Sequence, residues 1–201
     1  MSRCLPLMPI RGRSVVMTLL LLLLSAAAGS LASPADAAAV SVDVERRGEA
    51  VVIEASTRLN SSAATAWRVL TDYDRYGDFI PGVLSSRVVD RRGTTVTVEQ
   101  SDELALWLLR MPLRITYAIR EFPPNRVQSR ATISTLPPLE SSYVLTPVAF
   151  GVRLDYVGRI GPGWLLLGRI EQGALRRGVV RQFTALANEI ERRGTLAARA
   201  D

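Results

Sequence analysis

The feature that most constrains the fold is a run of alternating strands that ends in one long amphipathic helix. In MPLRITYAIREF apolar side chains alternate with polar ones, and RVQSRATIS, ESSYVLTP and VRLDYVGRI repeat this pattern after short turns. Such turns join antiparallel strands and leave no room for crossover helices. Near the C-terminus the apolar period becomes helical, at Leu175, Val179, Phe183, Leu186 and Ile190. Only this helix is large enough to cover the apolar face of the sheet, so the sequence predicts an α+β protein.

Residues 1–37 have the order of a secretory signal peptide. Arginines precede an apolar run with six consecutive leucines, and small residues follow up to an A-x-A site that ends at Ala37 or Ala39. We therefore expect cleavage and export to the periplasm or cell envelope. An uncleaved N-terminal anchor stays open as an alternative, because residues 15–31 approach the ~20 apolar residues that a membrane span needs.

The composition excludes several kinds of chemistry. The sequence has no histidine, every basic side chain is arginine, and its one cysteine, Cys4, precedes the apolar run of the leader. Imidazole general bases, thiolate or imidazole metal sites and lysine Schiff bases are thereby excluded. Loss of the leader with its three arginines and Asp36 would lower the formal charge from +6 to +4, and no dense basic stripe indicates a nucleic-acid partner. We expect no metal and no cofactor.

The acidic stretch VLTDYDRYGDFIPGV, residues 69–83, allows three interpretations. Asp72 and Asp74 fit the first and third positions of a calcium-binding EF-hand loop, but Val83 stands where a bidentate glutamate is required. A catalytic acid cluster would need one carboxyl in an apolar place, which nothing in the stretch indicates. We favour a corner of the fold, in which Asp74 caps a short helix and Pro81-Gly82 ends it.

A first short helix is predicted just before this corner. Residues 60–62, Asn-Ser-Ser, can cap it, and Ala63, Trp67 and Leu70 would form its inner face. Two short helices therefore separate the early strands from the later ones.

The run AWRVLTDYDRYGDFIPGVLSSRVVDRRG resembles the N-terminal signature of the polyketide cyclase/dehydrase group, which belongs to the START-related helix-grip superfamily. Coenzyme Q-binding (ubiquinone-binding) START-domain proteins share that superfamily. The residues that fill the pattern are Trp67, Asp72, Tyr73, Tyr76, Phe79, Pro81, Ser85, Ser86 and Val88, whereas Gly77 stands where family members often have proline.

The resemblance covers roughly residues 49–193 and implies a START-like helix-grip domain. This is a curved antiparallel sheet of about six or seven strands, wrapped around the long C-terminal helix, with two short helices after its first strand. Residues 38–48 would then form a lead-in strand, and residues 194–201 a C-terminal tail.

The resemblance also implies a ligand cavity between the concave sheet face and the helix. Our candidates for its lining follow the inward registers: Ile115, Tyr117, Ile119, Ala131, Tyr143, Leu145, Leu154, Tyr156, Arg176, Val179, Phe183 and Leu186. Tyr117 and Tyr143 could orient a polar head, because a buried hydroxyl needs a partner. Arg176 could bind an anionic head or extend outward. The alternative is that these side chains pack on one another as ordinary core.

Two apolar tracts, LALWLLRMPL and GWLLLGR, interrupt the alternation. Both join tryptophan and leucine to arginine, which suits a membrane interface. Candidate membrane-contact residues are Trp107, Leu108, Leu109, Trp164 and Leu165. The alternative is that each tract is an ordinary apolar connection that packs on the sheet.

These features favour an exported, non-enzymatic carrier or sensor of a hydrophobic small molecule, such as a lipid or isoprenoid quinone. No catalytic residue is identified, and the sequence leaves enzymatic activity open. A cyclase or dehydrase would have to use Asp102, Glu103 or Glu140, each of which is more simply a solvated strand-end residue. A structural envelope protein that binds a partner is a third possibility, and the oligomeric state is not indicated.

Overall fold

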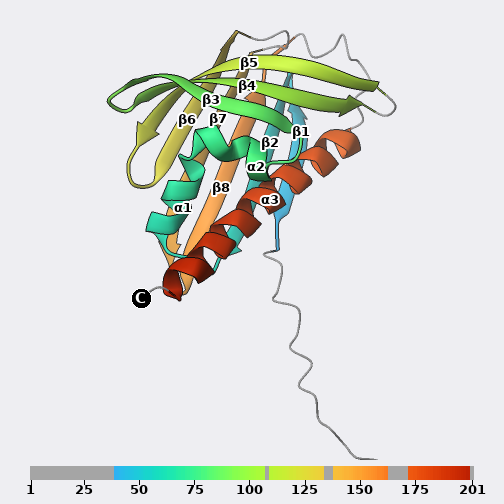
Figure 1. Ribbon diagram of the computed structural model, residues 1–201. Helices are drawn as coiled ribbons and strands as arrows, with labels where there is room; N and C mark the ends of the chain where they lie inside the picture. Colours follow the sequence, from blue (N-terminus) through green and yellow to red (C-terminus); the bar gives the residue numbers. More distant parts are fainter. Residues whose placement is uncertain (1–38, 107–108, 134–137, 163–171, 200–201) are drawn as a thin grey trace, which may run out of the picture. The chain divides into compact units, whose positions relative to one another are not determined.

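The protein is built on one sheet of eight strands (Figure 1). The structure is a computed structural model that describes residues 39–106, 109–133, 138–162 and 172–199. The strands are β1 (Ser41–Arg47), β2 (Ala50–Leu59), β3 (Val83–Arg92), β4 (Thr95–Leu106), β5 (Leu109–Phe122), β6 (Arg126–Ile133), β7 (Leu139–Val148) and β8 (Gly151–Ile160). The helices are α1 (Ala63–Leu70), the 3₁₀ turn η1 (Tyr73–Arg75), α2 (Tyr76–Phe79) and α3 (Gln172–Ala198). The leader, residues 1–37, lies outside the described residues.

All neighbouring strands are antiparallel, in the order β1-β2-β8-β7-β6-β5-β4-β3. The curved antiparallel sheet, the long C-terminal helix and the short helices confirm the predicted helix-grip architecture. The strand count is eight, not six or seven, because the predicted lead-in segment is β1, which pairs along its whole length with β2 and buries Val42 and Val44. The short helices consequently follow the second strand.

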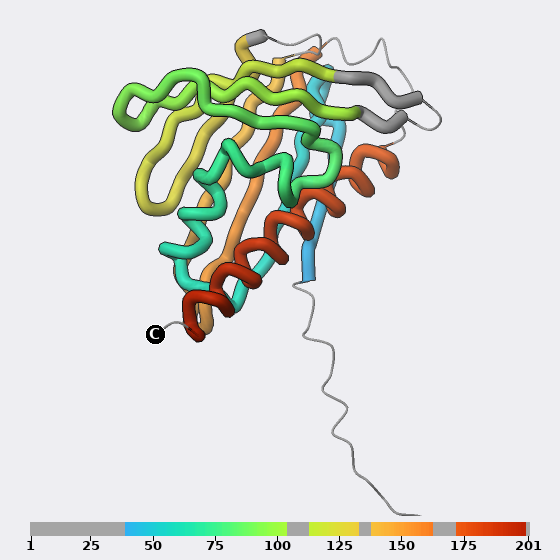
Figure 2. The backbone as a smooth tube through the Cα atoms, in the orientation of Figure 1, coloured from blue at the N-terminus to red at the C-terminus, as the bar shows by residue number. Residues whose placement is uncertain are grey.

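The helices lie on the concave side of the sheet. Figure 2 shows β3, β4 and β5 curving across one side of α1 and α2, while β7 and β8 run behind them. On α3, Phe183, Leu186 and Ile190 are at most 3% exposed and belong to the main apolar core. The predicted helical stripe thus faces the sheet, as the 3.6-residue period requires.

Helix α1 begins as predicted, and its buried face is wider than the predicted one. The side chain of its N-cap, Ser62, accepts a hydrogen bond from the backbone N–H of Thr65 at 3.1 Å. The fully buried apolar positions are Ala66, Val69 and Leu70, whereas Ala63 and Trp67 are half-buried beside them. The helix packs against the sheet and against α3, so its buried arc lies between the two contacts.

Helix α3 continues through Ala198, so most of the predicted tail is helical. Close approach to α1 occurs at Gly194, where a Cβ atom would meet the Ser61 side chain at 2.6 Å. Gly178 of the same helix has nothing within 4 Å of the position that a Cβ atom would take, so it makes no comparable close contact. Among the described helices, none is long and apolar enough to span a membrane.

Most of the tract LALWLLRMPL belongs to two paired strands. β4 extends to Leu106 and β5 begins at Leu109, and the two strands pair as far as these residues, whereas Trp107 and Leu108 lie outside the described residues. Alternation fails there as a signal because every residue of the tract except one arginine is apolar or proline.

Candidate functional site

The acidic stretch is a corner of the fold. Asp72 Oδ2 accepts a hydrogen bond from Arg193 Nη1 of α3 at 2.7 Å, and Asp74 Oδ1 accepts one from the backbone N–H of Val88 on β3 at 2.7 Å. Asp78 pairs with the arginine three residues before it. Asp74 is therefore not the expected helix cap; it ties η1 to the edge strand. In the described part of the chain, no three metal-ligating side chains converge.

The aromatic side chains of this corner face inward. Tyr73 and Tyr76 meet edge to face, with ring centroids 5.7 Å apart. The Tyr76 hydroxyl donates to the Leu70 carbonyl at 2.6 Å, which satisfies its donor. The Tyr73 hydroxyl is buried and has no hydrogen-bond partner among the described residues. The corner thus contributes two aromatic walls to the interior.

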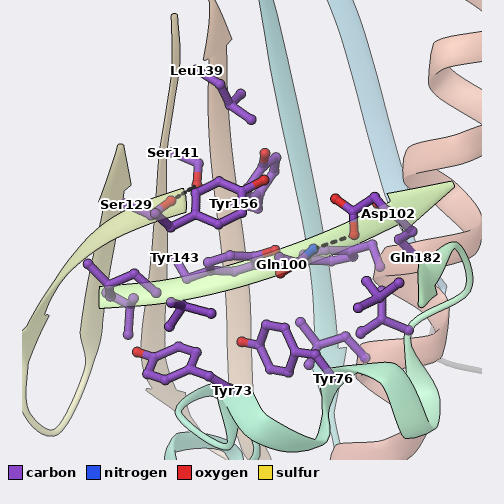
Figure 3. A pocket seen from close by; sticks show the side chains of 18 of the residues that line it. Tyr73, Tyr76, Gln100, Asp102, Ser129, Leu139, Ser141, Tyr143, Tyr156 and Gln182 are labelled. Carbon is purple, nitrogen blue, oxygen red and sulfur yellow. Dashed lines mark hydrogen bonds between the residues drawn. The ribbon is translucent and has the colours of Figure 1, made fainter. Parts of the chain in front are cut away.

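These walls close one side of a cavity of about 220 Å³ between the concave sheet face and α3 (Figure 3). It is lined by Tyr73, Tyr76, Ile80, Val83, Val98, Gln100, Asp102, Tyr117, Ile119, Val127, Ser129, Leu139, Ser141, Tyr143, Tyr156, Val179, Gln182, Phe183 and Leu186. All five tyrosines of the chain are in this set. The lining therefore combines apolar rings with many hydrogen-bonding groups, as ligand sites do.

One side of the cavity is polar. Gln100 and Asp102 of β4 lie there with Gln182 of α3 (Figure 3). Gln100 Nε2 donates to Asp102 Oδ1 at 2.8 Å, and Gln182 Nε2 donates to the Pro81 carbonyl at 3.1 Å. Burial raises the pKa of Asp102 to about 6, only partly opposed by the hydrogen bond from Gln100. Asp102 is thus a cavity residue, and its expected role as a solvated strand end is wrong.

The opposite side carries neutral hydroxyl groups. Tyr143 and Tyr156 lie with ring centroids 4.7 Å apart, and the hydroxyls of Ser129 and Ser141 are 2.8 Å apart. Burial raises the pKa of Tyr156 to about 12 and raises the pKa of Tyr143 well above its ordinary value. These tyrosines therefore stay protonated at neutral pH and can donate hydrogen bonds.

The comparisons with known proteins agree with this architecture. The family model described as polyketide cyclase / dehydrase and lipid transport matches residues 50–194, nearly the span expected for the domain. The chain belongs to this family. None of the curated proteins compared with this chain matches it.

Solved structures show the same fold at low sequence identity. TTHA0849 from Thermus thermophilus is 16% identical with a TM-score of 0.61, and the match covers 73% of this chain and 98% of that one. The Zhui aromatase/cyclase from Streptomyces sp. R1128 is 15% identical (TM-score 0.59; 75% and 97% covered). A STAR-related lipid transfer protein from Xanthomonas axonopodis is 17% identical (TM-score 0.57; 80% and 97% covered). The fold is thus shared by a cyclase and a lipid-transfer protein, and these likenesses establish the fold alone.

The structure brings seven of the twelve predicted lining residues to the cavity: Tyr117, Ile119, Tyr143, Tyr156, Val179, Phe183 and Leu186. Leu145 and Leu154 are at most 1% exposed and belong to the solid core, where α1 packs against β7 and β8. Ile115 is buried and Ala131 is half-buried, both outside the lining. Arg176 donates from Nε to the Val42 carbonyl of β1 at 3.0 Å, so it is tied to the sheet edge and not to the cavity.

Other predicted residues lie elsewhere. Trp107, Leu108, Trp164 and Leu165 fall outside the described residues, and Leu109 is the first residue of β5, with no described side chain. Glu140 is exposed and pairs with Arg130 at 2.8 Å, as a solvated strand residue would. Glu103 is half-buried and does not line the cavity.

Sequence reasoning missed the polar part of the lining. Gln100 and Asp102 continue the inward register of Val96 and Val98 on β4, so the signal was present in the alternation. Ser129 likewise shares its register with Val127. Polar residues at inward positions are the mark of a cavity, because a packed core would leave them without partners.

Proposed function

We propose that this protein binds a hydrophobic small molecule in the cavity between the sheet and α3, as a carrier or sensor. The observation that carries this proposal is the clustering of all five tyrosines around one hollow of about 220 Å³. Tyrosine rings add apolar surface and retain a polar tip, which suits a ligand with a greasy body and a small polar group. Membership of a family that includes lipid transport supports the same class of ligand.

The cavity volume favours a compact ligand. About 220 Å³ is below the range of roughly 300–1,000 Å³ for pockets that enclose drug-sized molecules. A ring system or a single short chain suits this volume. A long isoprenoid tail or a second acyl chain would have to extend out of the cavity or widen it.

A role without catalysis is the simpler one for this lining. Among the described lining residues Asp102 is the only ionised group at neutral pH, so no second carboxylate or base accompanies it.

We further propose that the protein is exported, on the strength of its N-terminal sequence. Intact-mass measurement of the protein from the periplasmic fraction should give a chain that starts after Ala37 or Ala39. A full-length mass would contradict cleavage.

Extraction of the purified mature protein with organic solvent, followed by mass spectrometry, tests ligand binding. The expected result is a lipid-like or quinone-like molecule in about equimolar amount. An extract without such a molecule would favour a structural envelope protein, because the hollow is small enough to remain simply water-filled.

A matched pair of variants ties the extracted molecule to the cavity. Val179 lines the cavity on α3, and a Val179→Trp substitution should fill it and remove the molecule from the extract. Asn188 is exposed on the same helix and away from the lining, so Asn188→Trp should retain the molecule. Equal ligand content in both variants would place the molecule elsewhere.

Catalysis is the second candidate, and Asp102 is the observation in its favour. Its pKa of about 6 is close to the value that suits a general base at neutral pH. The test is to incubate wild type and Asp102→Asn with the extracted molecule, or with an added aromatic polyketide, and to monitor its conversion by chromatography. Turnover that falls about a hundredfold or more in the variant would support an enzyme. If wild type forms no product, the result favours the carrier function over the enzymatic one.

A further inference from the structure

The charge distribution of the cavity is unbalanced. Asp102 is the only charged side chain among the lining residues, although the chain holds 25 basic residues, all of them arginine. Its neighbour Gln100 supplies one neutral hydrogen bond at 2.8 Å to Oδ1. In the described part of the chain, no arginine forms an ion pair with Asp102. Its second carboxylate oxygen remains available to accept a hydrogen bond.

Two arginines of α3 pair with groups other than Asp102. Arg176, which stands at the edge of the inner stripe of α3, donates to the carbonyl of Val42. Arg193 pairs with Asp72 and Glu189 on the far part of the helix. The third polar residue at this side, Gln182, is held by the Pro81 carbonyl through its amide nitrogen. The Asp102 side of the cavity thus presents a half-buried carboxylate with no countercharge among the described lining residues.

We infer that Asp102 is a specificity residue, and that the cavity selects amphiphiles whose head group donates hydrogen bonds or carries positive charge and rejects those whose head group is an anion. This inference rests on the proposed function and names the ligand class. An alcohol, phenol or amine can donate to the free carboxylate oxygen. A carboxylate or phosphate head would meet a like charge in a place that is partly removed from water, where repulsion is stronger than in bulk solvent.

The tyrosine and serine hydroxyls at the opposite side do not reverse this preference. They are neutral, and the hydroxyls of Ser129 and Ser141 already share a hydrogen bond. An isolated anion that leaves water needs a countercharge or several committed donors, and the described lining provides no countercharge. Free fatty acids are therefore poor ligands, whereas fatty alcohols and amines of the same length are good ones.

Three probes with the same chain test the inference by titration calorimetry at about pH 7.5: 1-decanol, decylamine and decanoate. Decanol and decylamine should bind wild type, and decanoate should bind at least about tenfold more weakly than decanol. In Asp102→Asn, decanoate affinity should rise towards that of decanol and decylamine affinity should fall. Glu99→Gln is the matched control, since Glu99 lies exposed on the other face of β4 and its loss changes the net charge equally.

The outcomes separate the two proposals. Decanoate that binds wild type as tightly as decanol, or a preference that persists in Asp102→Asn, overturns the inference while binding itself stands. Failure of all three probes to bind wild type overturns the proposed function and the inference with it. If Asp102→Asn does not fold, as judged by circular dichroism, the ranking of the three probes on wild type still decides the inference.

Discussion

Tyr156 holds its place in the cavity because the residue two positions further along β8 is glycine. A Cβ atom at Gly158 would collide with the Tyr156 hydroxyl, so the Tyr156 side chain can lie directly over the Gly158 backbone only because glycine has no side chain. This close approach brings the ring to within 4.7 Å of Tyr143, centroid to centroid. A side chain as small as a methyl group is enough to change the wall of the cavity.

Gly158→Ala should therefore displace the Tyr156 ring and destabilise the protein by about 1–3 kcal/mol, as overpacking does. Urea unfolding gives the change in free energy, and near-ultraviolet circular dichroism reports the altered tyrosine environment. Gly158→Ala/Tyr156→Phe is the matched control, because it removes the colliding hydroxyl and should recover part of the lost stability. An unchanged midpoint in the single variant would show that Tyr156 lies elsewhere.

Asp102 should make the stability depend on pH in an unusual direction for a carboxyl. Its pKa is about 6 in the folded protein against an ordinary 3.8, so the folded chain binds more protons than the unfolded chain between these values. Stability contributed by this group therefore falls as pH rises from about 4 to about 6. The loss is at most about 3 kcal/mol and less in practice, because Asp102 retains some solvent contact. Asp102→Asn should lack this decline when urea unfolding of both proteins is compared across that range.

The residue scale is also where sequence-based prediction failed most clearly. Alternation correctly gives the face of the sheet for Leu145, Leu154, Tyr143 and Tyr156, but it carries no information on what covers that face. Helix α1 packs against β7 and β8, and the two leucines are at most 1% exposed, while a hollow remains beside the two tyrosines. Asp102 was misjudged for a related reason: an inward polar residue looks like a strand end until the facing layer is known.

At the scale of elements, α3 is fixed to the acidic corner by Arg193. Its Nη1 contacts Asp72 and its Nε contacts Glu189, each at 2.7 Å, and its guanidinium lies 5.8 Å from the Phe79 ring centroid. Hydrogen bonds from Arg192 and Arg193 lower the pKa of Glu189 to about 2, so this carboxylate stays ionised in the folded protein. The corner that closes the cavity therefore depends on one arginine of the terminal helix.

Arg193→Ala should cost about 2–3 kcal/mol of unfolding free energy, because it leaves Asp72 unpaired and leaves Glu189 with Arg192 alone. Arg192→Ala is the matched control: Arg192 pairs only with Glu189 among the described residues and its side chain is 55% exposed, so its loss should cost less than about 1 kcal/mol. Urea denaturation of both variants gives the comparison. Equal losses would mean that the contact with Asp72 contributes little.

Gly178 weakens α3 without a packing role. A methyl group there would have nothing within 4 Å, and glycine inside a helix is less favourable than alanine by about 1 kcal/mol. Gly178→Ala should consequently stabilise the protein by about that amount in thermal or urea unfolding. Destabilisation would instead show that Gly178 makes a close contact that a methyl group disturbs.

The helices and strands were predicted well from the sequence, whereas the residues at which they begin and end were predicted less well. The apolar stripe of α3 and the strands from β5 to β8 follow from strong periodicity, which burial of alternate side chains imposes. The extension of α3 past Arg193 was not expected, since Gly194 looks like a helix end in sequence. In the structure this glycine instead allows α3 to pass close to Ser61. Local glycine signals cannot distinguish a helix terminus from a close helix contact.

In the whole molecule, the strand register determines which connections lie at the same end of the sheet, and so where the cavity can open. Strand register places the end of β4, the end of β6 and the end of β8 at the same end of the sheet. Each of the two apolar tracts includes or follows such a strand end: LALWLLRMPL begins within β4, and GWLLLGR follows β8 in the sequence. Tracts far apart in sequence are thus linked to one end of the molecule, which sequence alone did not establish.

We propose that the two tracts contact lipid when the ligand is loaded, and their link to one end of the sheet supports this proposal. The mature protein should float with vesicles of mixed zwitterionic and anionic phospholipid, and Trp107→Ser/Trp164→Ser should reduce the floated fraction severalfold, because tryptophan favours the membrane interface. Phe150→Ser is the matched control. Phe150 is 89% exposed at the turn between β7 and β8, at the opposite end of those strands, so its loss should leave flotation unchanged. Flotation that persists in the double tryptophan variant, or that is lost with Phe150, would place the membrane contact away from the two tracts.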